Sequence, residues 1–165
     1  NQPFAAEINF KMFCSSLRPL LLENKRDIEQ LDKLKNDFPK LMSKEMKLMW
    51  AKKLGLKNYD EQLTNQLFNL MNLSKADFTI FFRELSYIPE NISFLEECLY
   101  LHPTEELEKE WRIWLTKWQD CIKKNVGSEE ASKSMKQINP KYTWREWMIV
   151  PAYEEAEEGN YNQIP

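Results

Sequence analysis

The sequence predicts an all-α fold, an irregular array of about seven to nine helices. Only three glycines occur in 165 residues, and each follows a run with helical spacing. Valine occurs only at Val126 and Val150, and no run alternates polar with β-branched residues as a half-exposed strand would. Sparse glycine and missing strand patterns therefore favour helices throughout.

The first part of the chain divides at prolines and at a glycine. Apolar residues at helical spacing predict a helix over 4–22, which Pro19 is expected to end early. A second segment covers 27–36. Pro39 is then expected to begin a new helix, because proline suits a first helical turn, and Gly55 is expected to stop it.

The middle of the chain has several helix-start signals. Asp60 is expected to open a helix, and Ser74 with Asp77 has the spacing of a capping box before an aromatic helix. A turn at 88–90 should lead into a helix that buries Phe94, Leu95, Cys98 and Leu99.

The last third begins with Thr104, which can cap a helix that runs to about Asn125. A short helix is expected over 129–138. Thr143 and Glu146 form a further potential capping box, and Gly159 is placed to end that last helix in a left-handed conformation. Pro151 lies within this span, so a kink or break is expected there.

Composition favours one packed α-helical region over residues 1–165, since no stretch rich in Gly, Ser or Pro divides the chain. The net charge is −3 and the pI about 5.4, which gives no electrostatic footprint for nucleic acid or an anionic membrane. The first residue is Asn1 rather than Met, which suggests a fragment or a processed product. Three cysteines predict no disulfide framework and a reducing compartment.

Two clusters could be read as metal sites. His102, the only histidine, follows Cys98 by four residues and could be joined by Cys121, but paired short ligand spacings are missing, so a helix-terminal histidine is the favoured interpretation. The acidic group near the C-terminus is interpreted as solvated surface for the same reason; its members are Glu154, Glu155, Glu157 and Glu158.

Two further patterns leave alternatives open. Trp111, Trp114, Leu115, Trp118 and Ile122 recur at helical spacing, as a buried helix face requires, although a stacking or docking stripe has the same spacing. A locally basic helix could contact phosphate, but a solvated face is favoured; its lysines are Lys40, Lys44, Lys47, Lys52, Lys53 and Lys57.

No catalytic, cofactor-binding or metal-ligating residue is predicted. A triad needs a nucleophile, a base and an orienting acid, and the only histidine lies beside Pro103 in a turn. Phosphoryl or nucleotidyl transfer needs a phosphate cradle, and the sequence contains no Gly-rich loop.

Two stretches of the chain resemble a known family. The 139–161 stretch contains Asn-Pro-Lys-Tyr, then Arg145, an aromatic helix and Ala-Tyr-Glu-Glu-Ala-Glu-Glu-Gly-Asn-Tyr. The 54–86 stretch contains Leu-Gly-Leu, Asp-Glu-Gln-Leu, Ser-Lys-Ala-Asp-Phe-Thr and Phe-Arg-Glu-Leu-Ser. The first resembles the C-terminal signature of the selenoprotein O family, and the second is similar to the helical region that follows the kinase-like domain in the same family.

The resemblance implies the C-terminal part of a pseudokinase-type enzyme that transfers AMP from ATP, with Mg²⁺, to hydroxyl side chains of proteins. The catalytic residues would lie in a preceding kinase-like portion, and a redox-active tail would lie beyond Pro165. Cys14, Cys98 and Cys121 are not assigned that redox role. The resemblance also implies a mitochondrial protein if the source is eukaryotic and a cytoplasmic one if it is bacterial.

Two functional hypotheses follow. In the first, the chain supports the kinase-like portion of the same protein through an apolar face, formed either by Trp111, Trp114 and Trp118 or by Trp144 and Trp147; substrate proteins of the parent enzyme are further partners. In the second, the chain is a stand-alone, non-enzymatic module that presents an aromatic groove to a partner helix.

Overall fold

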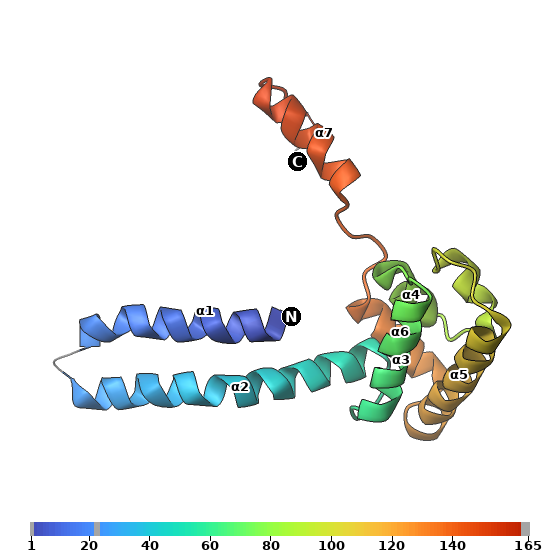
Figure 1. The fold of residues 1–165 in the computed structure, drawn as a ribbon, viewed down its shortest axis with the longest axis horizontal. Helices are drawn as coiled ribbons and strands as arrows, with labels where there is room; N and C mark the ends of the chain where they lie inside the picture. Colours follow the sequence, from blue (N-terminus) through green and yellow to red (C-terminus); the bar gives the residue numbers. More distant parts are fainter. Residues whose placement is uncertain (1, 22–23, 163–165) are drawn as a thin grey trace. The chain divides into compact units, whose positions relative to one another are not determined.

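The computed structural model describes residues 2–21 and 24–162, and most of these residues are helical (Figure 1). They contain no β-strand, only an isolated bridge between Ala76 and Leu99. The all-α prediction is therefore confirmed. The α-helices are α1 (Gln2–Leu17), α2 (Lys25–Lys53), α3 (Glu61–Leu73), α4 (Phe78–Leu85), α5 (Glu105–Asn125), α6 (Ser128–Ile138) and α7 (Glu146–Glu157), with 3-10 helices η1 (Arg18–Leu21) and η2 (Ile92–Glu97).

Contacts divide the chain into two compact units, residues 1–51 and 52–165. The boundary falls within the last turn of α2, where the sequence has no linker composition. The prediction of one continuous helical region within a larger protein stays a prediction. Across the described ranges, no helix is both long and apolar enough to cross a bilayer.

The first unit pairs α1 with α2. The rings of Phe10 and Phe38 stack with centroids 4.4 Å apart, and Arg18 donates two hydrogen bonds to the Asp32 carboxylate at 2.7 and 2.9 Å. As predicted, the α-helix ends before Pro19 and continues only as a 3-10 turn; the predicted end at Leu22 lies outside the described residues.

The predicted break before Pro39 is wrong, because α2 runs from Lys25 to Lys53 with Pro39 inside it. A proline at this point removes a single backbone donor from a long helix. The hydrogen bonds of the turns on either side, and packing such as the contact between Phe10 and Phe38, can hold the helix together across that gap.

The second unit packs around α5, which lies against α3. Trp111, Trp114, Leu115, Trp118 and Ile122 are all at most 3% exposed. Phe81 of α4 lies 5.5 Å from Trp111, and the rings of Trp114 and Trp118 stack 6.1 Å apart. These large rings form the core that positions the surrounding helices.

The turn between α3 and α4 differs from its prediction. Asp60 caps α3 as expected, accepting a hydrogen bond from the Leu63 N–H at 2.9 Å. Ser74, however, ends α3, and Asp77 caps α4 by accepting from the N–H groups of Thr79 and Ile80 at 3.0 Å. The predicted capping box is therefore wrong, and the cap lies three residues later.

The last helix, α7, ends where predicted, before Gly159, but does not start where predicted. Gly159 is left-handed, and its N–H donates to Ala156 O while the Asn160 N–H donates to Glu155 O. This pair of bonds is a Schellman motif. The helix begins at Glu146 rather than near Thr143, with Arg145 as an N-cap residue that makes no side-chain capping bond. Pro151 does not break α7.

Candidate functional site

The residues weighed as metal ligands do not converge. His102 is exposed in the coil before α5, whereas Cys98 is 1% exposed. Burial, followed by the negative charges of Glu84, Glu97 and Asp77, raises the pKa of the Cys98 thiol to about 12. In the described part of the chain, no three His, Cys, Asp or Glu side chains gather as a metal site, and this holds for the acidic group of α7 as well.

The tryptophan face of α5 is part of the core. Its three indole N–H groups donate hydrogen bonds to the α3 side of the unit: Trp111 to Ser74 Oγ at 2.9 Å, Trp114 to Leu63 O at 2.9 Å and Trp118 to Leu54 O at 2.8 Å. A buried indole N–H needs such a partner. This face therefore cannot be the predicted docking stripe.

The basic helix separates into two environments. Lys40, Lys44 and Lys47 are exposed, in agreement with the interpretation as a solvated face. Lys53 is half-buried, its ammonium lies 4.8 Å from the centre of the Phe82 ring, and burial lowers its pKa. Sequence periodicity alone could not separate Lys53 from its neighbours.

A polar cluster around Asn139 joins the two resembling stretches. Asn139 is fully buried, and its amide donates to Lys53 O at 2.9 Å and to Ser86 Oγ at 3.1 Å. Its Oδ1 accepts from Lys53 Nζ at 3.0 Å, and its backbone carbonyl accepts from Arg83 Nη1 at 3.2 Å. Every polar group of this buried amide is thus used.

A second cluster joins the same stretches through charge. The Asp77 carboxylate is 6% exposed and accepts two hydrogen bonds from Arg145 Nη2, at 3.0 and 2.8 Å, and one from Tyr100 Oη at 2.8 Å. Burial acts to raise the Asp77 pKa, but the hydrogen bonds from Ile80 N–H, Tyr100 and Arg145 outweigh it and hold the pKa below its usual value. The same contact with Asp77 raises the pKa of Tyr100.

We call Asp77, Tyr100 and Arg145 the clasp. Its charges satisfy one another, so it does not offer a free acid or base. Its effect is positional, because Arg145 directly precedes α7 and is held beside the first turn of α4. The sequence showed Asp77 and Arg145 as parts of two separate motifs, but their pairing across 68 residues could not be read from either.

The segment on either side of Arg145 exposes large aromatic side chains. Tyr142, Trp144, Trp147 and Tyr153 are 78, 77, 75 and 63% exposed. Such rings lose favourable burial energy when they face water, and clusters of them are typical of interfaces. Of the two predicted docking faces, this one is exposed and the α5 face is buried.

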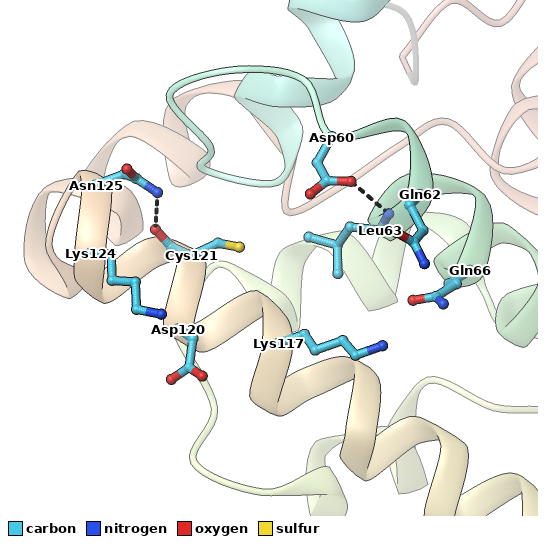
Figure 2. Close-up of a pocket in the computed structure, with 9 residues that line it drawn as sticks. All are labelled: Asp60, Gln62, Leu63, Gln66, Lys117, Asp120, Cys121, Lys124 and Asn125. Atoms are coloured by element: carbon cyan, nitrogen blue, oxygen red, sulfur yellow. Dashed lines mark hydrogen bonds between the residues drawn. The ribbon is translucent and has the colours of Figure 1, made fainter.

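A shallow pocket of about 340 Å³ lies between α3 and α5 (Figure 2). Cys121 Sγ points from α5 towards Leu63, while the Asp60 carboxylate is occupied by its capping bond to Leu63 N–H. The other lining residues are Gln62, Gln66, Lys117, Asp120, Lys124 and Asn125. No histidine lines the pocket to activate the thiol.

These features define a helical region with a tryptophan core, two polar clusters that join distant motifs and an exposed aromatic segment. The chain belongs to the family described as Protein adenylyltransferase SelO, which matches it over residues 1–164. The resemblance of the two stretches is thereby confirmed.

Curated relatives are bacterial proteins called Protein nucleotidyltransferase YdiU. The chain is 29% identical to the one from Vibrio parahaemolyticus over 99% of its length, 30% to the one from Flavobacterium johnsoniae over 99%, and 32% to the one from Anoxybacillus flavithermus over 96%. It covers 33, 33 and 31% of those proteins. The chain therefore spans about a third of the length of the curated relatives it matches.

Proposed function

We propose that this chain is a non-catalytic helical part of a protein adenylyltransferase, and that it supports the kinase-like portion of the same protein. The parent enzyme would transfer AMP from ATP, with Mg²⁺, to hydroxyl side chains of substrate proteins. Family membership and the one-third coverage of the relatives support this assignment. ATP and Mg²⁺ would bind the kinase-like portion, and the chain itself would contact neither nucleic acid nor membrane.

The exposed aromatic segment carries the proposal. Trp144 and Trp147 are about three-quarters exposed, whereas the tryptophans of α5 are at most 2% exposed. The segment is also tied to the core by the Arg145–Asp77 pair, so its rings start from a fixed point. A segment that is anchored at one residue loses less entropy when it docks than a freely moving one.

The occupant of this patch is the kinase-like portion. The relatives are about three times as long as the chain, which provides a large partner surface within one polypeptide. The match to the family reaches residue 164, so the aromatic segment lies within the matched region. The protein would be cytoplasmic if its source is bacterial and mitochondrial if it is eukaryotic.

Titration calorimetry, which measures binding of the chain to a separately made kinase-like portion, tests this proposal. Trp144→Ala combined with Trp147→Ala should weaken binding on the order of a hundredfold, as expected when two anchor residues are lost. Ile113→Ala, at a site 56% exposed on α5, is the matched control and should leave binding unchanged. Equal binding by the double variant and the wild type would contradict the docking face.

The alternative is the stand-alone interaction module. The exposed aromatic rings suit that role too, but the tryptophans of α5 are buried and cannot line its aromatic groove. Failure of the wild-type chain to bind the kinase-like portion would favour this alternative.

A further inference from the structure

Helix α1 has two apolar sides, and among the described residues of its unit only one of these sides is packed. Phe10 stacks on Phe38 of α2, and Cys14 is 2% exposed. Phe4, Ile8 and Met12 follow one another at four-residue spacing and are 61, 41 and 68% exposed. Because each residue turns a helix by about 100°, Ile8 lies almost opposite Phe10.

The charge distribution of α1 is that of an interior helix. Its charged side chains are Glu7 and Lys11, and these form an ion pair with each other. Helix α2, in contrast, is rich in lysine and aspartate. A helix that is apolar on opposite sides is typically covered on both.

We propose that the outer face of α1, formed by Phe4, Ile8 and Met12, is a second docking surface for the kinase-like portion of the same protein. This inference rests on the proposed function, and it adds a contact from the first unit to the one made by the aromatic segment. The partner's matching surface is apolar and uncharged, because a charge opposite Ile8 would be buried without a partner.

Two observations favour this occupant over a second copy of the chain. The family match begins at residue 1, so α1 lies within the matched region, and the relatives offer about twice the chain's length in further sequence. Three side chains on a 16-residue helix form a patch of a few hundred square ångströms, far below the roughly 1,200 Å² of a stable interface. Such a patch suits one part of a larger contact within a single protein.

The test introduces a charge at the centre of the face. Ile8→Glu in the full chain should weaken binding to the separately made kinase-like portion at least tenfold in calorimetry, while far-UV circular dichroism keeps the wild-type helix content. Leu73→Glu, at an exposed leucine (53%) at the end of α3, is the control and should bind like the wild type. Met12→Ser provides a milder variant, with a smaller loss expected.

The outcomes separate this inference from the proposed function. If the wild-type chain does not bind the kinase-like portion, the proposed function fails. If the wild type binds and Ile8→Glu binds within twofold of it, this inference fails while the proposed function stands. A wild-type dimer in sedimentation that Ile8→Glu dissociates would assign the face to a second copy instead. A fall in melting temperature of the isolated chain on Ile8→Glu would show that the face is covered within the chain, which also overturns the inference.

Discussion

The Arg145–Asp77 pair should be one of the stronger polar contacts of the second unit. Hydrogen bonds to charged groups contribute about 1.5–3 kcal/mol, and this pair has two of them to a carboxylate that is 6% exposed. The Arg145 side chain is 37% exposed, so water screens part of that energy. Asp77 also keeps its backbone donors and Tyr100 when the arginine is lost. We therefore expect Arg145→Met to lower the free energy of unfolding by about 1–2 kcal/mol, below the 3–5 kcal/mol of a fully buried pair.

A double-mutant cycle isolates the pair. Asp77→Asn keeps a good N-cap residue but removes the charge, so the cycle with Arg145→Met should give a coupling energy of about 1 kcal/mol. Urea unfolding followed by near-ultraviolet circular dichroism, to which the stacked Trp114 and Trp118 rings contribute, measures it in the second unit. Arg112→Met removes an exposed pair with Glu108 and should cost less than about 0.5 kcal/mol.

The stability that the Arg145–Asp77 pair contributes should fall as the pH is lowered. The folded-state pKa of Asp77 is lowered, so its charged contacts contribute fully above the unfolded value of about 3.9 and are lost as the pH falls through the folded pKa. The stability difference between wild type and Asp77→Asn should thus be constant above about pH 5 and shrink below about pH 4. A coupling energy near zero, or a difference that grows on acidification, would refute the reasoning.

Three other predictions concern buried or strained residues. Asn139→Ala removes a fully buried amide and leaves its partners unsatisfied, so urea unfolding should show a loss of about 2–4 kcal/mol; a loss under 1 kcal/mol would contradict the network. Gly55→Ala combines a φ of +65° with a new Cβ 2.7 Å from a methionine sulfur of α6, and should lower the melting temperature more than Gly127→Ala, where φ is +91° but nothing lies within 4 Å; the reverse order would count against the packing. Iodoacetamide at about pH 8 should modify Cys121 before Cys98, whose pKa is about 12, and mass spectrometry that finds Cys98 labelled first would overturn its burial.

Local signals predicted those elements whose ends are determined locally. Asp60 and Thr104 cap their helices as expected because each side chain bonds to an N–H within its own first turn. Gly159 ends α7 because a left-handed residue is needed there. The periodicity of the α5 tryptophans correctly predicted a buried face.

The errors arose where distant residues decide the outcome. Ser74 has the spacing of a cap, yet its hydroxyl accepts the indole N–H of Trp111, 37 residues away. Thr143 does not start the last helix. Arg145, two residues later, has an extended backbone and is held by Asp77, so the helix starts at Glu146. Such contacts leave no local signal, so a single sequence could not reveal them.

The candidate site was predicted only in part. The docking hypothesis named Trp144 and Trp147 together with a second face, and only the structure separated the exposed pair from the buried one. The outer face of α1 was hidden in the sequence because apolar residues on both sides of a helix give no clear polar side.

Transfer of AMP to protein by the kinase-like portion, with and without this chain, tests the central claim most directly. If the chain supports the catalytic portion, its addition should raise the rate on the order of tenfold or more, because positioning of a catalytic site is sensitive to distant supports. Trp144→Ala with Trp147→Ala should remove most of that gain. Full activity of the kinase-like portion alone, unchanged when the chain is added, would contradict the account.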